Sequence, residues 1–298
     1  MPAVYLANVG ANAAHPFASP LFADGTFELL PIVETPPAPG PHSLRFFDLR
    51  SWYRPEEGLR RWLPARVLGL SAHADPEFAT FTYGDNCERS PRAAALRSVR
   101  PGDLLFFIAR LVRAARGEAQ SGAPGRRPPP QLSSGPGGGL EPSGPETGTQ
   151  PSGPFLHRAG FYLAGFLEIE SILPNVTRRP SRAAFSRFGA NAHVHRGLND
   201  PRHWDGFWVF AGSDRSRRFQ RAVPVDRAFA EAVLRDAEGR PFRWDPQRTR
   251  LQVIGSYTRS CRRIIQASPG APGDASARAE ALRAAVEAAN PGVMAGLL

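Results

Sequence analysis

Two apolar runs on either side of a long glycine- and proline-rich segment constrain the fold of this chain most strongly. Residues 104–108 read LLFFI after the turn residues Pro-Gly-Asp, and residues 160–169 read GFYLAGFLEI. Short, aromatic-rich apolar runs bounded by turn residues are typical of buried strands rather than helices. Between them, residues 117–154 hold 10 glycines and 9 prolines in 38 positions. We therefore predict two adjacent strands of one sheet, joined through a long disordered insertion.

The rest of the chain predicts a mixed architecture. Strand-like segments occur at 3–9, 26–32, 207–211 and 251–256, and helix-like segments with capping residues at 91–98, 226–235 and 275–289. This pattern favours an α+β fold, either a curved mixed sheet or a small β-barrel elaborated with helices. The expected organisation is a single α+β domain made of residues 1–116 and 155–270, a disordered insertion at 117–154, and a C-terminal helix and tail at 271–298.

Composition excludes several classes of enzyme. The 298 residues include no lysine, so Walker A phosphate loops, kinase strand lysines and Schiff-base catalysis are ruled out. The two cysteines, Cys87 and Cys261, are far apart, which argues against a disulfide framework and for a reducing compartment. No leader sequence and no long apolar segment is visible, so we expect a cytoplasmic protein with no membrane partner.

Arginines are concentrated in one third of the chain. Residues 174–266 contain 19 arginines against 8 aspartates and glutamates, which accounts for the net charge of +10. Guanidinium groups interleaved with hydroxyls suit phosphate oxygens, although a genomic bias toward arginine is the alternative explanation. We predict a nucleic-acid or nucleotide partner. The predicted phosphate-binding residues are Arg215, Arg217, Arg218, Arg259 and Arg262.

Polar side chains that can read the hydrogen-bonding edge of a planar ligand occur in three separate segments. The first is the segment ANVGANAAH at 7–15, the second is TYGD at 82–85, where the tyrosine could stack on a base, and the third is NAHVHR at 191–196. The alternative is that each side chain caps its own turn. If these side chains converge in one concavity, a ligand-binding site is favoured; if they are scattered, turn capping is favoured. The predicted ligand-binding residues are Asn8, Asn12, His15, Tyr83, Asp85 and His193.

The sequence contains no recognisable catalytic motif. The nucleophile elbow G-x-S-x-G and the dinucleotide fingerprint are both missing, so catalysis is unassigned, with His15, Asp24 and Asp85 as acid or base candidates. His193, His195 and His203 have a spacing that could serve a metal, but no carboxylate completes a signature. We therefore expect no metal and no cofactor, with His193 hydrogen-bonded in a loop.

Taken together and in order, six segments resemble a known family. They are ANVGANAAHPFASPLFADGTFELLPI at the start, TYGD at 82–85, RPGDLLFFIARL paired with GFYLAGFLEIE, NAHVHR at 191–196, SDRSRRFQRAVPV from 213 and YTRSCR at 257–262. The chain resembles the third type of nucleotide modification associated domain. That resemblance implies work beside DNA base-modification systems of bacteria and phages, including phage defence, without implying a particular reaction.

The strand pair also resembles the centre of PUA-like barrels of the EVE and ASCH type, which implies an aromatic-lined pocket for a modified base. On the basis of these two resemblances, we expect a module that recognises a modified base or nucleotide. DNA is the favoured nucleic acid. Two alternatives remain open: an enzyme acting on that base or nucleotide, and an adaptor that recruits base-modification enzymes as partners.

Overall fold

The computed structural model describes residues 1–10, 17–114, 159–235, 239–243, 254, 257, 259–266 and 272–298. The predicted insertion at 117–154 lies outside the described residues, as do the ligand candidates Asn12 and His15 and most of the predicted strand at 251–256.

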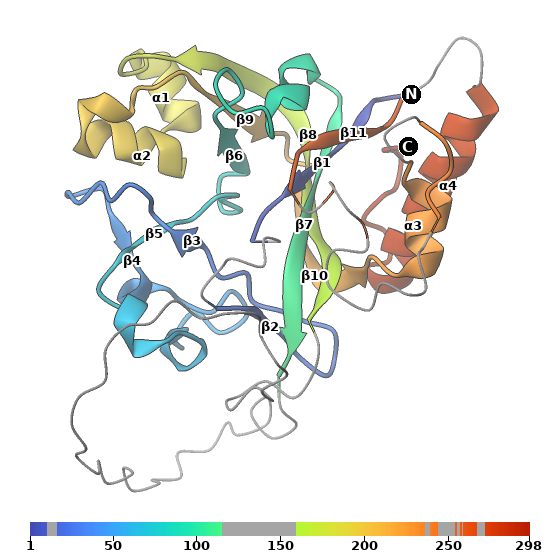
Figure 1. The fold of residues 1–298 in the computed structure, drawn as a ribbon, viewed down its shortest axis with the longest axis horizontal. Helices are drawn as coiled ribbons and strands as arrows, with labels where there is room; N and C mark the ends of the chain where they lie inside the picture. The colour runs from blue at the N-terminus through green and yellow to red at the C-terminus, as the bar shows by residue number, and fades with distance from the viewer. Residues whose placement is uncertain are drawn as a thin grey trace, which may run out of the picture.

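The predicted pair of apolar strands forms the centre of the molecule (Figure 1). Strand β7 (Leu104–Arg113) pairs antiparallel with β8 (Gly160–Val176), from Leu104 opposite Glu168 to Leu111 opposite Gly160. Over the paired residues both strands are almost continuously apolar because both of their faces are covered, whereas β8 beyond Ile169 is mostly half-buried or exposed. The prediction that they are neighbours is confirmed.

An eight-stranded mixed sheet is built around this pair. Its order is β11-β1-β7-β8-β9-β6, with β10 added on β8 and β2 on β7. Strand β1 lies parallel to β7 and antiparallel to β11, whereas β6 pairs antiparallel with β9 and forms one end of the order. The further bounds are β1 (Val4–Asn8), β2 (Ser19–Leu21), β6 (Thr82–Asp85), β9 (Phe207–Gly212), β10 (Arg217–Pro224) and β11 (Arg262–Ile265).

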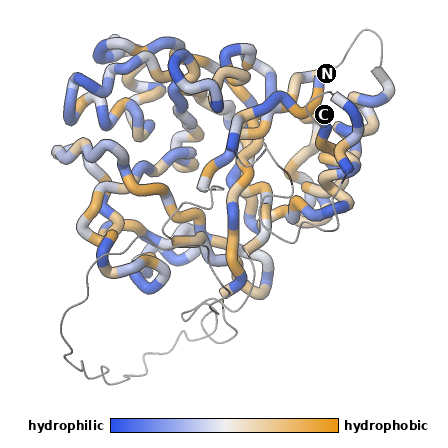
Figure 2. The backbone as a smooth tube through the Cα atoms, viewed as in Figure 1, coloured by the Kyte–Doolittle hydropathy of each residue, from blue (hydrophilic) through white to orange (hydrophobic). Residues whose placement is uncertain are grey.

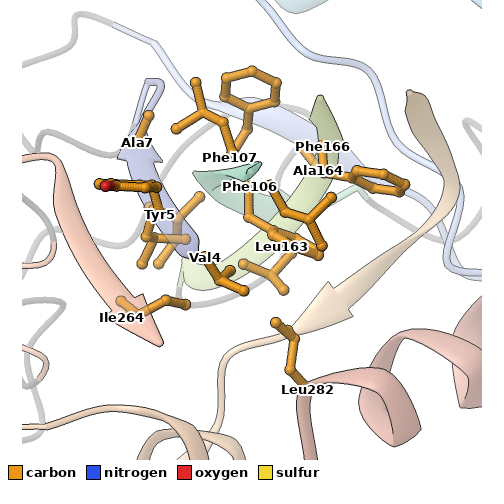
Figure 3. Close-up of a cluster of buried hydrophobic side chains, with 14 of the residues drawn as sticks. Val4, Tyr5, Ala7, Phe106, Phe107, Leu163, Ala164, Phe166, Ile264 and Leu282 are labelled. Carbon is orange, nitrogen blue, oxygen red and sulfur yellow. The ribbon is translucent and has the colours of Figure 1, made fainter. Parts of the chain in front are cut away.

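The main core lies between this sheet and two helices. Helices α3 (Arg227–Val233) and α4 (Pro272–Ala289) lie together on one side of the sheet (Figure 1). Apolar residues concentrate along the central strands (Figure 2), and Figure 3 shows side chains from β1, β7 and β8 meeting Ile264 of β11 and Leu282 of α4. Both helices fall where the sequence predicts them, α3 beginning after the capping residue Asp226.

A smaller sheet and two short helices lie on the other side. Strands β3 (Ile32–Val33), β5 (Ser71–His73) and β4 (Leu44–Arg45) pair in that order. Helices α1 (Arg182–Phe188) and α2 (Ala192–Asn199) lie close to β9 and β6 (Figure 1). Short 3₁₀ helices occupy Phe46–Asp48, Arg60–Trp62, Ala65–Val67, Ala94–Ser98 and Pro201–His203.

Two predicted elements differ from the structure. The strand predicted at 26–32 is wrong except at its last residue: Phe27 makes one isolated bridge to Leu21, but the Leu30 amide donates to the Ser19 hydroxyl rather than to a backbone carbonyl, so no continuous ladder forms. The helix predicted at 91–98 forms only as the 3₁₀ turn Ala94–Ser98.

The α+β class and the mixed sheet are as expected, but a closed barrel is not seen. In the part of the chain that the structure describes, the terminal strands β11 and β6 do not pair with each other, so the PUA-like architecture is not confirmed. None of the described helices is both long and apolar enough to cross a bilayer.

Candidate functional site

A cavity of about 870 Å³ lies beside the edge strand β6. It gathers residues from β1, the β3 segment, β5, β6 and α2, which are far apart in sequence. Of the residues singled out in the sequence, it brings together Asn8, Tyr83, Asp85, His193 and Arg259. Its other lining residues include Glu34, His73, Asp75, Asn86, Arg92 and Arg196.

Asp85 is the centre of a buried polar cluster on one face of β6. Its Oδ2 accepts hydrogen bonds from the Tyr83 hydroxyl at 2.9 Å and from Arg92 Nη2 at 2.8 Å. Its Oδ1 accepts the Asn86 amide at 2.8 Å. The residue is only 4% exposed. These donors hold the carboxylate in one orientation, with its negative charge compensated by a guanidinium.

Asn8 adds a side-chain amide to the same cluster. Its Oδ1 accepts a hydrogen bond from Arg92 Nη1 at 3.0 Å, so the amide nitrogen Nδ2 is directed away from Arg92. That Nδ2 atom is buried and has no hydrogen-bond partner among the residues that the structure describes. An unpaired buried donor is costly, so an acceptor atom of a ligand that reached Nδ2 would remove this cost.

Tyr83 supports Asp85 rather than offering a stacking surface. It is 3% exposed, and its ring packs against Phe107 and Phe210 at centroid distances of 5.3 and 6.5 Å. Burial, together with the charge of Asp85, raises the pKa of the Tyr83 hydroxyl well above its usual value, so the group stays a donor. The predicted stacking on a base is therefore not available from this ring.

Cys261 adjoins the cluster, with its Sγ 3.9 Å from the Tyr83 hydroxyl and 3.8 Å from Asp85 Oδ2. Burial raises the pKa of its thiol to about 12, an effect larger than the opposing influence of Arg92. Arginines near this residue in sequence therefore do not produce a thiolate, and Cys261 serves as a small buried side chain.

On the opposite face of β6, two histidines surround a buried aspartate. The Nε2 atoms of His73 and His193 lie 3.8 and 3.6 Å from Asp75 Oδ2. Asp75 Oδ2 also accepts the Gly84 amide at 2.8 Å. Burial raises the pKa of Asp75 and lowers that of His193, so each neutral form is favoured.

The local structure around His193 differs from the sequence-based interpretation. Residues 192–199 form helix α2, not a loop, and the Asn191 side chain caps it by accepting the His193 amide at 3.0 Å. Asn and His at a helix start are compatible with turns as well, which is why the pattern alone was ambiguous. The helix directs His193 into the cavity, whereas His195 lines a different one.

The remaining candidates do not join this site. Asp24 lines another cavity. Burial alone would raise the pKa of its carboxyl, but hydrogen bonds from the Thr26 amide and hydroxyl outweigh this effect and lower the pKa. Arg218 is buried against Glu28, and Arg215 pairs with Glu168 at 3.2 Å. Arg217 is exposed on β10, and Arg262 lies on β11 near Tyr257. Of the predicted phosphate-binding arginines, Arg259 is the one that lines the cavity.

Sequence reasoning missed the partners that organise the site. Arg92, His73 and Asp75 were not singled out, although the segment His-Ala-Asp at 73–75 places two ligating side chains on one side of an extended chain. That spacing was a usable signal. Arg92 gave none, because one arginine among 37 basic residues is not distinctive.

Comparisons with known proteins give one clear result. The family described as nucleotide modification associated domain 3 matches residues 4–248, which include every described residue of the cavity except Arg259. A search of curated proteins and a search of solved structures each found no match. Because the family match covers most of the chain, from β1 to beyond α3, the chain belongs to the nucleotide modification associated domain 3 family.

Proposed function

We propose that the cavity beside β6 recognises a nucleotide, or a modified base presented from a DNA strand. The observation that carries this proposal is the Nδ2 donor of Asn8, which has no hydrogen-bond partner among the described residues and lies next to the fixed Asp85–Arg92 pair in a cavity of about 870 Å³. Pockets for small organic ligands span roughly 300–1,000 Å³ and carry a few oriented polar groups.

The groups in the cavity suit a nucleobase edge. A carbonyl or ring nitrogen of a base can accept from Asn8, and an amino or ring N–H can donate to Asp85 Oδ1, which accepts one hydrogen bond from the described residues. Arg92 and Arg259 supply positive charge for a phosphate. A base within a duplex would have to be flipped out to reach such a site, whereas a free nucleotide or a single strand would not.

Arginines at the rim of the cavity and beyond it would hold the rest of a nucleic acid: Arg217 and Arg259 are exposed, and Arg215 and Arg262 are half-buried. We keep Arg215, Arg217, Arg259 and Arg262 as proposed phosphate contacts and leave out Arg218, whose side chain is 4% exposed. The family description, association with nucleotide modification, fits a module that reads the substrate or the product of a modifying enzyme. Such an enzyme is the proposed protein partner.

Calorimetry with a panel of ligands tests the proposal. The panel comprises unmodified and base-modified deoxynucleoside monophosphates and short single-stranded and duplex DNA. The variant Asn8→Asp replaces the free donor by an acceptor of the same shape, and Arg92→Gln removes the charge. Arg97→Gln is the matched control, because Arg97 is half-exposed, pairs with Glu88 at 3.7 Å and does not line the cavity.

We expect at least one panel member to bind, with affinity reduced about tenfold or more in both cavity variants and unchanged in the control. Binding that is equally weakened by Arg97→Gln, or that survives both cavity changes, would contradict the proposal. Chromatography of the incubated nucleotides addresses the alternative: conversion of a ligand would make this an enzyme, with Asp85 as the acid–base candidate.

A further inference from the structure

Three ligating side chains meet at the wall of the cavity. They are His73 from β5, Asp75 just beyond β5 and His193 from the first turn of α2. One nitrogen or oxygen atom from each lies within 4.8 Å of the other two. Donor atoms around a tetrahedral zinc ion lie roughly 3.4 Å apart, given bonds of about 2.1 Å. The imidazole-to-carboxylate distances of 3.6 and 3.8 Å are close to that separation.

His73 is held in the orientation that a ligand requires. Its Nδ1 lies 2.9 Å from Glu34 Oε2, so a proton on Nδ1 leaves the Nε2 lone pair facing Asp75. Glu34 is fixed in turn by Arg196, whose Nε lies 2.9 Å from Glu34 Oε1. A carboxylate behind the far nitrogen of an imidazole is the usual outer support of a metal-binding histidine.

His193 reaches the cluster because the facing strand has a glycine. A Cβ at Gly84 would lie 2.5 Å from His193 Cδ2 and 2.8 Å from Asn191 Oδ1. No side chain larger than hydrogen fits there. The strand, the helix cap and the histidine therefore form one packed unit that aims the imidazole at Asp75.

The distribution of charge leaves Asp75 without a cation. Arg92 pairs with Asp85 at 2.8 Å and Arg196 pairs with Glu34 at 2.9 Å. Over the described part of the chain, the ion-pair partners of Asp75 are the two histidines alone, and its side chain is 3% exposed. Burying a carboxylate without a cationic partner is expensive, and a bound metal ion would remove that cost.

We propose that His73, Asp75 and His193 bind a divalent transition-metal ion whose remaining coordination positions face the cavity. Two imidazoles and one carboxylate suit Zn²⁺ or Fe²⁺ rather than Ca²⁺ or Mg²⁺, which prefer oxygen ligands. Three protein ligands with open positions are typical of sites that also take water or a ligand atom. This inference goes beyond the proposed function and does not depend on it.

The three histidines whose spacing in the sequence could serve a metal, His193, His195 and His203, do not converge in the structure. On α2, His195 turns to a second cavity and stacks on His42, and His203 contacts Arg196 and Asp200. The carboxylate that the sequence seemed to lack comes from Asp75, more than a hundred residues earlier.

Metal titration of the full chain, without an affinity tag and stripped with a chelator, tests the site. Co²⁺ is followed by its visible absorption and Zn²⁺ by calorimetry, both in the absence of nucleotide. The variants are His193→Ala and the nearly isosteric Asp75→Asn. His195→Ala is the matched control on the same helix, and circular dichroism checks that each variant is folded.

We expect one ion per wild-type chain with micromolar or tighter affinity, a loss of about tenfold or more in both variants, and an unchanged control. Failure of the wild type to bind one ion, or an equal loss in His195→Ala, would overturn the proposal. Should both variants unfold, X-ray absorption of the metal-loaded wild type decides instead: scattering from two imidazoles supports the site, and its absence refutes it. Nucleotide binding measured in the presence of chelator separates this proposal from the previous one.

Discussion

Arg92 donates to Asp85 at 2.8 Å while nearly half of its own side chain stays exposed. The pair therefore joins a buried anion to a cation that solvent and ligands can reach. The other terminal nitrogen of Arg92, Nη1, donates to Asn8 Oδ1, so one guanidinium positions both side chains that we propose for reading a base.

Replacing Asp85 by alanine should weaken both binding and folding. The change leaves the Tyr83 hydroxyl and one side of Arg92 without their acceptor, which costs about 1–3 kcal/mol of unfolding free energy. Urea denaturation and nucleotide calorimetry on the same samples measure the two effects. Asp48→Ala, at an exposed position, is the control and should change neither. Full stability together with full affinity in Asp85→Ala would show that the cluster has no role.

Arg217 and Arg218 are neighbours in sequence but should respond very differently to mutation. Arg218 lies against Glu28 and over the rings of Trp52 and Tyr53, with its side chain 4% exposed. Arg218→Ala should lower the free energy of unfolding by about 3 kcal/mol, because it leaves Glu28 buried without its cation. Arg217→Ala, on the exposed side, should lie within about 0.5 kcal/mol of wild type. Equal effects in chemical denaturation would contradict this assignment.

A methyl group at Gly84 should disturb the site directly. Gly84→Ala places its Cβ against His193 and Asn191 and should cost about 1–3 kcal/mol in thermal or urea unfolding. Metal affinity should fall with it, since His193 must move. Gly69→Ala is the matched control, because a Cβ there meets nothing within 4 Å. A stability for Gly84→Ala equal to that of the control would mean that the packing around His193 is loose.

The buried thiol of Cys261 predicts both a low reactivity and an alkaline limit to stability. Its pKa is raised to about 12 in the folded chain, so the unfolded chain loses the thiol proton first as pH rises. Stability should therefore decline from about pH 9, the ordinary value for a thiol, up to about pH 12. At pH 8, iodoacetamide should label Cys261 only after unfolding, as mass spectrometry of the alkylated peptide can show. Rapid labelling of the native chain would disprove its burial.

Replacing residues 117–154 by a short glycine-serine linker should leave the fold intact. Leu111 and Gly160 are partners across β7 and β8, so the strands on either side of the deletion are held by their own ladder. Loop closure depends weakly on length, and the melting temperature should change by only a few degrees. Loss of the cooperative transition would show that the deleted residues carry part of the core.

Elements marked by an apolar run or by a capping residue before helically spaced apolar residues were predictable from sequence, and the elements without such a pattern were not. Strands β7 and β8 combine apolar runs with turn residues, and Asp226 marks the start of α3. The small sheet has strands of two or three residues, too short for any alternation to show. Helices α1 and α2 have seven and eight residues, and their caps Ser181 and Asn191 are equally common in turns.

The candidate site shows the same division. Asn8, Tyr83, Asp85 and His193 could be singled out because polar groups stand next to apolar strands, and the structure brings these four to one cavity. Their ligand-binding role stays a prediction. The His-Ala-Asp spacing at 73–75 is a local signal, but the contacts of Arg92 with Asn8 and of Asp75 with His193 join segments far apart in the chain, which no local pattern specifies.

The position of Gly84 between two polar clusters has a consequence for how the cavity can respond. Strand β6 carries Asp85 on one face and receives Asp75 and His193 on the other, and it lies at the end of the order of described strands. An ion on one face and a nucleotide on the other would therefore be in thermodynamic linkage through one short strand. If either shifts β6, each must alter the affinity of the other by the same factor, since coupling free energy is reciprocal.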